Sequence, residues 1–330
     1  MKQSDPMMTA VYVSRFGGTE VLQTRQVPVP EPEPGMVRIR VAAAGVNYAD
    51  IMQREGLYPR GPKPPFPAGF EVAGTIDAIG PGVMGWEPGM PVMAFCVGGY
   101  AEYTVTPARM CLPVPPGLPV TDAAAIPCQY FTAWHALFTL GRLSAGGSVL
   151  IHAAAGGLGS FMVQLARQAG ARVVGVCGTA GKSALALELG CDAAIDLSAT
   201  PDFEQAARDA SGGQGYDLII ESVGGERLDR SLRCLKPRGM LVTLGVAARV
   251  PAMVNTVELL ANNWIVAGFH LTAYMEDTDA TARGYARLVE LLGAGTLRVV
   301  IGHRFPLVEA ARAHAEIEAR RTTGKVLLIP

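Results

Sequence analysis

The spacing of apolar and polar positions changes along the chain and divides it into two parts. Residues 10 to 110 contain short apolar runs, such as MVRIRVAAAGV and FEVAGTIDAIG, which are separated by Gly and Pro. No helical period interrupts these runs, so we predict a compact, twisted and mostly antiparallel β-domain. A Pro-rich stretch at 111–119 then leads into the apolar segment AAAIPCQYFTAWHALF, where we expect a helix with Thr121 and Asp122 as candidate N-caps.

From Ser148 onward, strand-like and helix-like segments alternate. The runs SVLIHA, RVVGVC, AAID, YDLIIESV and GMLVTLGV are separated by helical patterns of roughly 10 to 15 residues. Such alternation is typical of βαβ units and predicts an α/β fold with a doubly wound parallel sheet, whose binding site lies at the carboxyl ends of the strands. The last segment, KVLLIP, is strand-like, and we expect it to return to the first domain.

Composition and charge exclude several classes of partner. The 330 residues carry 28 Lys and Arg against 29 Asp and Glu, so there is no basic excess to favour nucleic acid or an anionic membrane surface. Two stretches without charged residues, 123–141 and 143–166, approach the length of a membrane span. Pro127 interrupts the first and several glycines interrupt the second, so we expect no membrane span.

Targeting and cysteine usage indicate the cytoplasm. The first ten residues, MKQSDPMMTA, lack the apolar core and small-residue cleavage site of a signal peptide, and we expect them to form a loose tail. The six cysteines are widely spaced and form no CxxC or CxxH pattern, which is typical of reduced cysteines and not of a disulfide framework or structural zinc.

The segment AAAGGLG, which follows the strand SVLIHA, is the strongest sign of function. Gly156 and Gly159 match the second and third glycines of the dinucleotide fingerprint, with Ala154 at the first position and an extra Gly157. Such glycines let the backbone approach a pyrophosphate at a helix N-terminus. Cys177 stands where an NAD-selective site usually has Asp or Glu, so we expect NADPH to be preferred over NADH.

Several further motifs occur in the order found in one superfamily. They are GVNYAD at 45–50, GLYP at 56–59, FPAGFEVAGTIDAIG at 66–80, GGYAEY at 98–103, AAIPCQYFTAWHAL at 124–137 and GKVLLIP at 324–330. Together they resemble the zinc-independent quinone oxidoreductase (zeta-crystallin-like) branch of the medium-chain dehydrogenases/reductases. The resemblance implies a GroES-like catalytic domain at 1–122 and 270–330 and an NADPH-binding Rossmann domain at 123–269. It also implies a homodimer joined through sheet edges, with MLVTLGVAA and WIVAGFH as candidate edge segments.

The same resemblance implies that the protein holds no metal. Zinc-dependent members have a cysteine ligand where this chain has Asn47 and a histidine ligand where it has Phe70. Only Glu71 and Cys128 remain of that set, and two separated residues do not make a tetrahedral zinc site. Without a Lewis acid, reduction of an electron-poor acceptor is the expected chemistry.

The resemblance also assigns the candidate site residues. Asn47 and Tyr58 match polar groups near the nicotinamide and the acceptor, and either could donate a hydrogen bond to a carbonyl oxygen; alternatively, Asn47 braces a loop and Tyr58 only packs its ring. Met52 replaces a tyrosine common in bacterial quinone reductases, which makes the acceptor pocket more apolar. The expected cofactor-binding residues are Thr132, Ala155, Gly156, Gly157, Leu158, Gly178, Thr179, Lys182, Val223, Gly245, Phe269 and Lys325.

Three functions are compatible with these residues. The first is NADPH-dependent reduction of a quinone or similar conjugated carbonyl. The second is reduction of the carbon–carbon double bond of an enone or enoyl thioester. The third, from another class, is a non-catalytic NADPH-binding protein with a crystallin-like or regulatory role.

Overall fold

Six parallel strands form the central sheet of one structural unit, which comprises residues 129–298. The structure is a computed structural model and describes residues 6–330. The strand order is β11-β10-β9-β12-β13-β14, the arrangement of a doubly wound nucleotide-binding fold. The strands are β9 (Ser148–His152), β10 (Arg172–Cys177), β11 (Ala193–Asp196), β12 (Tyr216–Glu221), β13 (Leu235–Thr243) and β14 (Ile265–Gly268). The side chains of Val149, Leu150 and Ile151 in β9 are fully buried, as expected for a central strand covered on both faces.

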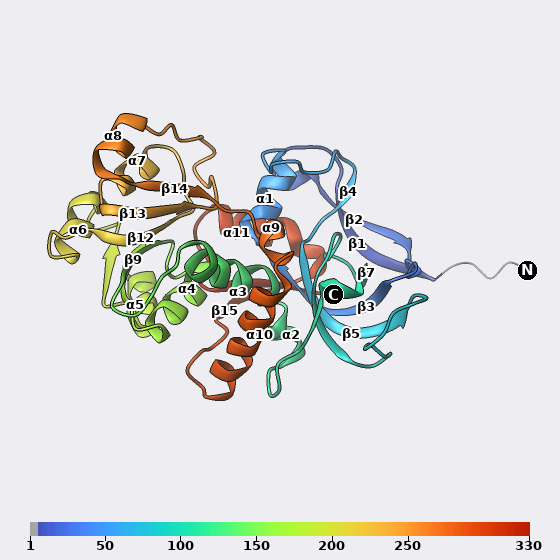
Figure 1. Ribbon diagram of the computed structural model, residues 1–330. Helices are drawn as coiled ribbons and strands as arrows, with labels where there is room; N and C mark the ends of the chain where they lie inside the picture. Colours follow the sequence, from blue (N-terminus) through green and yellow to red (C-terminus); the bar gives the residue numbers. More distant parts are fainter. Residues whose placement is uncertain (1–5) are drawn as a thin grey trace, which may run out of the picture. The chain divides into compact units, whose positions relative to one another are not determined.

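Helices connect these strands and cover both faces of the sheet. In Figure 1, α4 and α5 lie on one side of it, and α7 and α8 lie on the other. The helices of this unit are α3 (Pro127–Trp134), which begins two residues before the unit boundary, a π-helix (His135–Leu140), α4 (Gly157–Gln168), α5 (Ala180–Glu188), α6 (Phe203–Ala210), α7 (Glu226–Leu232), α8 (Thr256–Asn262), α9 (Leu271–Met275) and α10 (Thr278–Gly293).

The other unit, formed by residues up to 128 and 299–330, is built mainly from antiparallel strands. A three-stranded sheet has the order β2-β1-β4, and a seven-stranded sheet has the order β15-β16-β3-β5-β6-β8 with β7 also paired to β3. The strands are β1 (Met7–Val13), β2 (Leu22–Pro28), β3 (Met36–Val46), β4 (Phe66–Pro67), β5 (Glu71–Ile79), β6 (Pro91–Phe95), β7 (Tyr103–Pro107), β8 (Cys111–Pro113), β15 (Ile301–Pro306) and β16 (Lys325–Ile329). The helices are α1 (Tyr48–Glu55), α2 (Val120–Ala123) and α11 (Ala310–Glu318).

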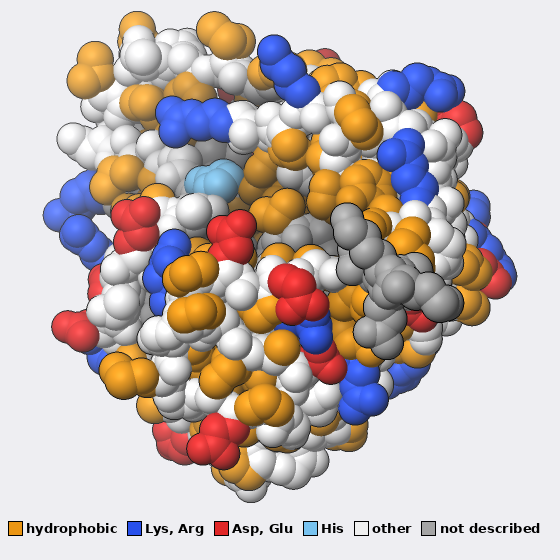
Figure 2. Space-filling model, turned by 90° about the vertical axis from the view of Figure 1, so that its right-hand side faces the viewer, with side chains coloured by type: hydrophobic (Ala, Val, Ile, Leu, Met, Phe, Trp, Pro, Cys, Tyr) orange, Lys and Arg blue, Asp and Glu red, His pale blue; other side chains and the backbone are white. Residues whose placement is uncertain are grey.

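These two units confirm the predicted fold class, an antiparallel β-domain with a doubly wound parallel sheet. The expected return of the last strand is also confirmed, because β16 pairs with β3 through Val326 and Val46. Residues 143–166 form a strand, a turn and a helix, as expected. No helix among residues 6–330 is both long and apolar enough to cross a membrane. On the face shown in Figure 2, side chains of both charges are scattered among apolar ones.

The boundary between the units differs from the expected one. The sequence placed it after residues 122 and 269, whereas the structure divides the chain after residues 128 and 298. Residues 270–298 belong to the unit of the parallel sheet because α10 is hydrogen-bonded to α3. The Tyr130 hydroxyl donates to the carbonyl of Gly284 at 2.9 Å, and Trp134 Nε1 donates to the carbonyl of Ala280 at 3.1 Å.

Three smaller predictions also need correction. The expected loose tail is wrong for residues 7–10, which belong to β1, while residues 1–5 lie outside the described part of the chain. The single helix expected after Thr121 is interrupted: α2 ends at Ala123, and α3 begins at Pro127, whose ring cannot continue a helix but fits its first turn. MLVTLGVAA contributes β13, which pairs on both sides, so of the two candidate segments WIVAGFH alone, through β14, lies at an edge of the sheet.

His152, at the end of β9, leads to a prediction about acid stability. Its Nε2 lies 2.8 Å from Ser231 Oγ, and because that hydroxyl donates to the carbonyl of Arg227, Nε2 must carry the proton. The buried Nδ1 has no hydrogen-bond partner among residues 6–330. Burial, together with the charge of Arg227, lowers the pKa of His152 to about 3. The folded protein therefore keeps this imidazole neutral where the unfolded chain binds a proton.

We expect His152→Leu to make the protein more resistant to acid. In the wild type, stability conferred by neutral His152 is present above the unfolded pKa near 6.5 and is lost as the pH falls toward 3. The loss grows by about 1.4 kcal/mol for each pH unit below the unfolded pKa and so reaches about 2 kcal/mol at pH 5. Leucine does not titrate, so the variant should not suffer this loss. Urea unfolding at pH 7.5 and 5.0 measures the difference. Equal losses in the two proteins between these pH values would contradict the assignment.

Candidate functional site

The carboxyl edge of the six-stranded sheet gathers most of the residues expected to bind the cofactor. Because all six strands are parallel, the residues that follow them emerge at the same edge. The structure places Ala155, Gly156, Gly157 and Leu158 after β9, Gly178 and Thr179 after β10, Val223 after β12, Gly245 after β13 and Phe269 after β14. The turn after β9 lies where the strand order reverses, because β9 has β10 on one side and β12 on the other.

The turn after β9 has the geometry that brings a helix N-terminus close to the sheet. Gly156 is the extended N-cap residue, and α4 begins at Gly157, so the first amides of the helix have no partner within it. A Cβ added at Gly159 would lie 2.6 Å from Cα of Ala154 and closer still to the carbonyl oxygen of Ala153. The helix therefore packs on the turn in a way that only glycine permits.

Sequence reasoning did not find the residue that makes this turn sharp. Ala154 was matched to the first glycine of the fingerprint, but the left-handed backbone conformation belongs to Ala153, at φ 54°. A left-handed alanine is strained because its Cβ approaches the carbonyl oxygen. No pattern in the sequence marks this position, since alanine does not indicate a positive φ.

The end of β10 lacks an acidic group at the expected ribose position. Cys177 closes the strand, and burial raises the pKa of its thiol, so it is a neutral group. Thr179 caps α5, with its hydroxyl oxygen accepting from the backbone N–H of Lys182 at 3.4 Å. This helix N-terminus carries no Asp or Glu in its first turn, which suits a bound anion.

The end of β12 contains a buried carboxylate that sequence reasoning missed. Glu221 is fully buried, and its two oxygens accept hydrogen bonds from the backbone N–H groups of Val223 and Gly224 at 2.7 and 2.9 Å. Burial raises the pKa of the Glu221 carboxyl, while the two N–H groups oppose the shift. Glu221 thus fixes the path of the loop that carries Val223. An acidic residue at the end of a strand was the available signal.

Two further predicted residues sit on helices or beside them. Phe269 lies directly after β14, donates its N–H to the carbonyl of Thr243 at 2.9 Å, and stacks on Tyr274 with the ring centroids 4.7 Å apart. Thr132 is half-buried in α3.

In the other unit, Asn47 belongs to a closed buried network. It lies between β3 and α1, and its side-chain Oδ1 accepts from Lys325 Nζ at 2.8 Å. Its Nδ2 donates to Glu71 Oε1 at 2.8 Å, and Lys325 Nζ donates to the same oxygen at 2.6 Å. The structure therefore brings together two residues that were assigned separate roles, Asn47 near the acceptor and Lys325 on the cofactor. The contact of Lys325 with the cofactor stays a prediction.

Asp50 holds the start of α1. Its Oδ2 accepts from the backbone N–H of Asn47 at 2.7 Å, while its buried Oδ1 has no hydrogen-bond partner among the described residues. Burial raises the pKa of Asp50 to about 7, with the Asn47 N–H and the charge of Lys325 opposing the shift. Asp50 therefore changes charge near neutral pH in the interior of this unit.

Tyr58, the second candidate near the acceptor, lies just after α1. Its ring centroid is 5.3 Å from that of Phe70, and its backbone N–H donates to the carbonyl of Met52 at 3.1 Å. Burial raises the pKa of Tyr58 to about 12, and Cys128 and Asp50 add to the shift. The hydroxyl is therefore a neutral hydrogen-bond donor across the physiological pH range.

The residues in this region do not fit a zinc ion. Lys325 places an ammonium against the oxygens of Asn47 and Glu71, and Phe70 offers no ligand atom. The remaining sulfur, on Cys128, is held as a thiol because burial raises its pKa well above the usual value, with the charge of Glu71 adding to this. Within residues 6–330, no group of three or more His, Cys, Asp or Glu side chains is arranged to hold a metal.

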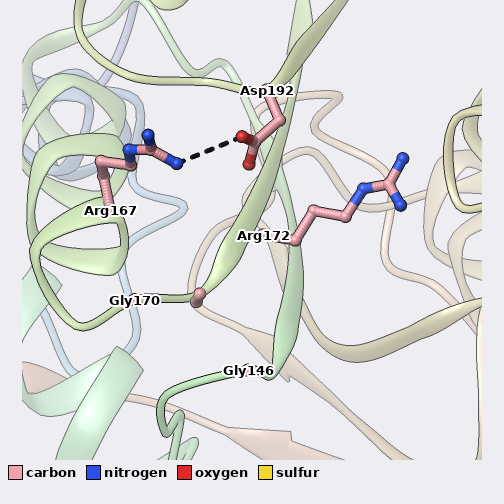
Figure 3. Close-up of a pocket in the computed structure, with 6 residues that line it drawn as sticks. Gly146, Arg167, Gly170, Arg172 and Asp192 are labelled. Atoms are coloured by element: carbon pink, nitrogen blue, oxygen red, sulfur yellow. Dashed lines mark hydrogen bonds and ion pairs between the residues drawn. The ribbon is translucent and has the colours of Figure 1, made fainter.

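A surface hollow at the opposite edge of the parallel sheet does not belong to this site. It is lined by Gly146, Arg167, Gly170, Arg172 and Asp192, near the amino ends of β9 and β10 (Figure 3). Arg167 Nη1 is paired with Asp192 Oδ1 at 3.2 Å, and Arg172 donates to the carbonyl of Ala210. Both cations are already engaged with the protein, and ligands of this fold bind at the carboxyl edge.

Two family models match the chain. Residues 33–116 match the alcohol dehydrogenase GroES-like domain, and residues 189–328 match a model described as zinc-binding dehydrogenase. The first falls within the antiparallel unit, and the second extends from the parallel sheet into β16.

Curated relatives align with the chain along nearly its whole length. A 2-haloacrylate reductase from Burkholderia sp is 35% identical, covering 98% of this chain and 99% of the relative. A quinone oxidoreductase from Rattus norvegicus is 32% identical with full coverage of both chains, and one from Pseudomonas aeruginosa is 34% identical, covering 98% of this chain and all of the relative.

Solved structures show the same fold. The quinone oxidoreductase of Escherichia coli, solved in complex with NADPH, has a TM-score of 0.92 at 30% identity and covers 98% of this chain and all of its own. A mycobacterial protein complexed with NADPH has a TM-score of 0.93 at 33% identity with the same coverage.

Proposed function

Because the chain belongs to the quinone oxidoreductase family of the medium-chain dehydrogenases/reductases, we propose that it uses NADPH to reduce a quinone or a similar conjugated carbonyl. The observation that carries the proposal is the convergence of the expected cofactor residues at the carboxyl edge of the parallel sheet. The relatives are named as a reductase and a quinone oxidoreductase, so the protein is an enzyme and the non-catalytic alternative is not favoured. We also propose a cytoplasmic location, which fits six cysteines that form no disulfide.

The residues at the sheet edge suit a phosphorylated dinucleotide. The amides at the start of α4 and the close packing of Gly159 provide for a pyrophosphate. Beside them, β10 ends in the neutral Cys177 and not in the carboxylate that would repel a 2′-phosphate, and Thr179 and Lys182 offer a hydroxyl and a cation. When bound, NADPH supplies the hydride, and the net reduction also takes up one proton.

Tyr58 is the group that we propose to assist the acceptor. The oxygen of a quinone or conjugated carbonyl gains negative charge as it is reduced, and a neutral hydroxyl stabilises it by donating a hydrogen bond. The raised pKa of Tyr58, about 12, keeps that proton in place. Asn47 stays a second candidate, although its amide is already engaged by Lys325 and Glu71.

A substrate panel tests the function. NADPH oxidation by the purified protein should be followed with 1,4-benzoquinone, 9,10-phenanthrenequinone, enones and enoyl thioesters, with NADH in parallel. We expect quinone turnover with a preference for NADPH. NADPH binding without turnover of any quinone would contradict the proposal, and a clear NADH preference would overturn the interpretation of Cys177.

One relative supports a second acceptor class. A 2-haloacrylate reductase is 35% identical to this chain, and a haloacrylate contains a carbon–carbon double bond conjugated to a carboxylate. The alternative is therefore addition of hydride to a double bond in an enone or enoyl thioester. Product analysis separates the two functions, because a hydroquinone indicates the first and a saturated product the second.

We predict that Tyr58→Phe lowers kcat for the acceptor by roughly tenfold to a hundredfold, because it removes one donor to the developing charge. Affinity for NADPH should be unchanged. Steady-state kinetics with the best acceptor of the panel, together with NADPH titration, measure both quantities. Tyr103→Phe, on β7 of the same unit, is the matched control and should keep full activity. An unchanged kcat in Tyr58→Phe would reduce Tyr58 to a packing role.

We further propose that the protein forms a homodimer through β14 and α8. β14 is an edge strand, and edge strands leave unpaired backbone groups that a second copy can pair. No residue of α8 is buried within this chain. Exposed apolar side chains continue along this region and comprise Val250, Met253, Val257, Leu260 and Ile265. A group of exposed apolar side chains on one stretch of the chain favours an interface.

A pair of matched variants tests the dimer. Met253 and Met84 are both 89% exposed, but only Met253 lies in this region. We expect Met253→Glu to weaken the dimer, because association would bury an unpaired charge, whereas Met84→Glu should leave it intact. Light scattering coupled to size-exclusion chromatography measures the molecular mass. A monomeric wild type, or an equal effect of the two variants, would contradict this interface.

A further inference from the structure

Lys325 is an unusual lysine because it lies inside the antiparallel unit with only 2% of its surface exposed. Lysine is almost never buried to this extent unless it is paired. Its ammonium lies 2.6 Å from Glu71 Oε1 and 2.8 Å from Asn47 Oδ1. Three neighbouring strands bring these residues together: β16 starts at Lys325, β3 ends just before Asn47, and β5 starts at Glu71.

Several hydrogen bonds hold the network around this lysine at once. Glu71 Oε1 accepts from both Lys325 and Asn47, and Glu71 Oε2 accepts from the backbone N–H of Cys128 at 2.6 Å. The backbone also packs closely against Glu71, because a Cβ added at Gly45 would lie 2.5 Å from a Glu71 oxygen. Neither the cation nor the carboxylate can shift without breaking several bonds.

The network is connected to the candidate acceptor residues through α1. Asn47 precedes the first residue of this helix, and Asp50 in its first turn accepts from the Asn47 N–H. At the other end, α1 stops at Gly56 in a left-handed conformation, and the N–H of Tyr58 donates to Met52 in the helix. A displacement of Asn47 therefore also moves α1, to which the backbone of Tyr58 is hydrogen-bonded.

We propose that Lys325 is a positioning residue, whose buried ammonium holds Asn47 against Glu71 and thereby fixes α1 and Tyr58 for the reaction. This inference rests on the proposed function for its catalytic consequence, but its structural part does not. It differs from a contact with NADPH, the role that the resemblance implies for Lys325, and the two roles give different experimental results.

The test uses Lys325→Met, Glu71→Gln and the double variant. Each single variant leaves a buried charge without its partner, so we expect the melting temperature to fall by about 10 °C. The double variant removes both charges and should recover most of that loss. Lys236→Met, which breaks an exposed pair with Asp217, is the matched control and should melt within a few degrees of the wild type.

Two readouts in the double variant separate positioning from stability. If Lys325 holds α1, hydrogen–deuterium exchange in residues 45–58 should be faster than in the wild type although the melting temperature has recovered. Acceptor kcat should fall by roughly tenfold to a hundredfold, with NADPH affinity unchanged. Recovery of stability with wild-type exchange and wild-type kcat would overturn the proposal, as would weaker NADPH binding with unchanged exchange.

A further variant covers the case in which the double variant does not fold. Asn47→Ala keeps the Lys325–Glu71 ion pair but disconnects it from α1, so we expect a smaller fall in the melting temperature than in either single charge variant, with faster exchange in residues 45–58. Wild-type exchange in that variant would overturn the proposal. If the wild type reduces no acceptor, the proposed function fails, whereas melting and exchange still decide this inference.

Discussion

Gly159→Val is expected to abolish detectable NADPH binding. The added Cβ would lie 2.6 Å from Cα of Ala154, a distance that real Cβ atoms do not reach, so α4 must move away from the turn after β9. The helix N-terminus would then no longer present its amides at the carboxyl edge of the sheet, and a pyrophosphate would lose its main donors. Overpacking of this kind also costs about 1–3 kcal/mol of stability.

Fluorescence titration with NADPH measures this effect, and thermal melting establishes that the variant is folded. Gly293→Val is the matched control, because Gly293 lies in the last turn of α10 and a Cβ there meets no atom within 4 Å. It should bind NADPH like the wild type. If Gly159→Val binds NADPH with an affinity within about tenfold (about 1.4 kcal/mol) of the wild type, the turn after β9 is not the pyrophosphate site.

Arg54→Met is expected to cause a large loss of stability, about 3–5 kcal/mol. Arg54 is fully buried near the end of α1, and its guanidinium forms two bonds to Glu318 at 3.0 Å each. It also donates to the carbonyl of Gly17 and to Glu55, and it lies 3.3 Å from His314 Nδ1. All five N–H groups are thus engaged, and methionine would replace none of them.

Urea unfolding at neutral pH measures the change. Arg304→Met is the control, because Arg304 pairs with Asp122 in the same unit but is about half exposed, and its removal should cost less than about 1 kcal/mol. Arg54→Lys should behave more like Arg54→Met than like the wild type, since an ammonium cannot reproduce a planar fork of donors. A loss below 1 kcal/mol in Arg54→Met would contradict the proposed importance of this cluster.

The sequence predicted the parallel unit well because its signals are local. Each strand is a short apolar run, each helix has its own period, and the turn at Gly156 and Gly159 has a known geometric purpose. These features do not depend on distant parts of the chain. The strand order itself was not predicted, because the fixed hand of βαβ crossovers decides which face each helix covers and not which strands are neighbours.

Features that depend on distant contacts could not be predicted. The pairing of Lys325 with Asn47 joins residues 278 positions apart, and nothing near either residue indicates it. The same is true of α10, whose sequence suits either unit and whose place is decided by bonds to Tyr130 and Trp134. Ala153 was missed for a different reason, because a left-handed alanine has no distinctive local pattern, whereas the strand-end acid Glu221 carried a signal that was not used.

The divided antiparallel unit has a consequence for how the protein is made. The first part of this unit, up to residue 128, leaves the ribosome long before β15 and β16, and all of residues 129–298 are synthesised in between. During that interval Glu71 lacks the ammonium of Lys325, with which it pairs in the folded protein. Because an unpaired charge is costly to bury, the Glu71 carboxylate has to stay in water until then. The nascent chain is thus expected to complete its parallel unit first and to close its antiparallel unit only after Lys325 has emerged.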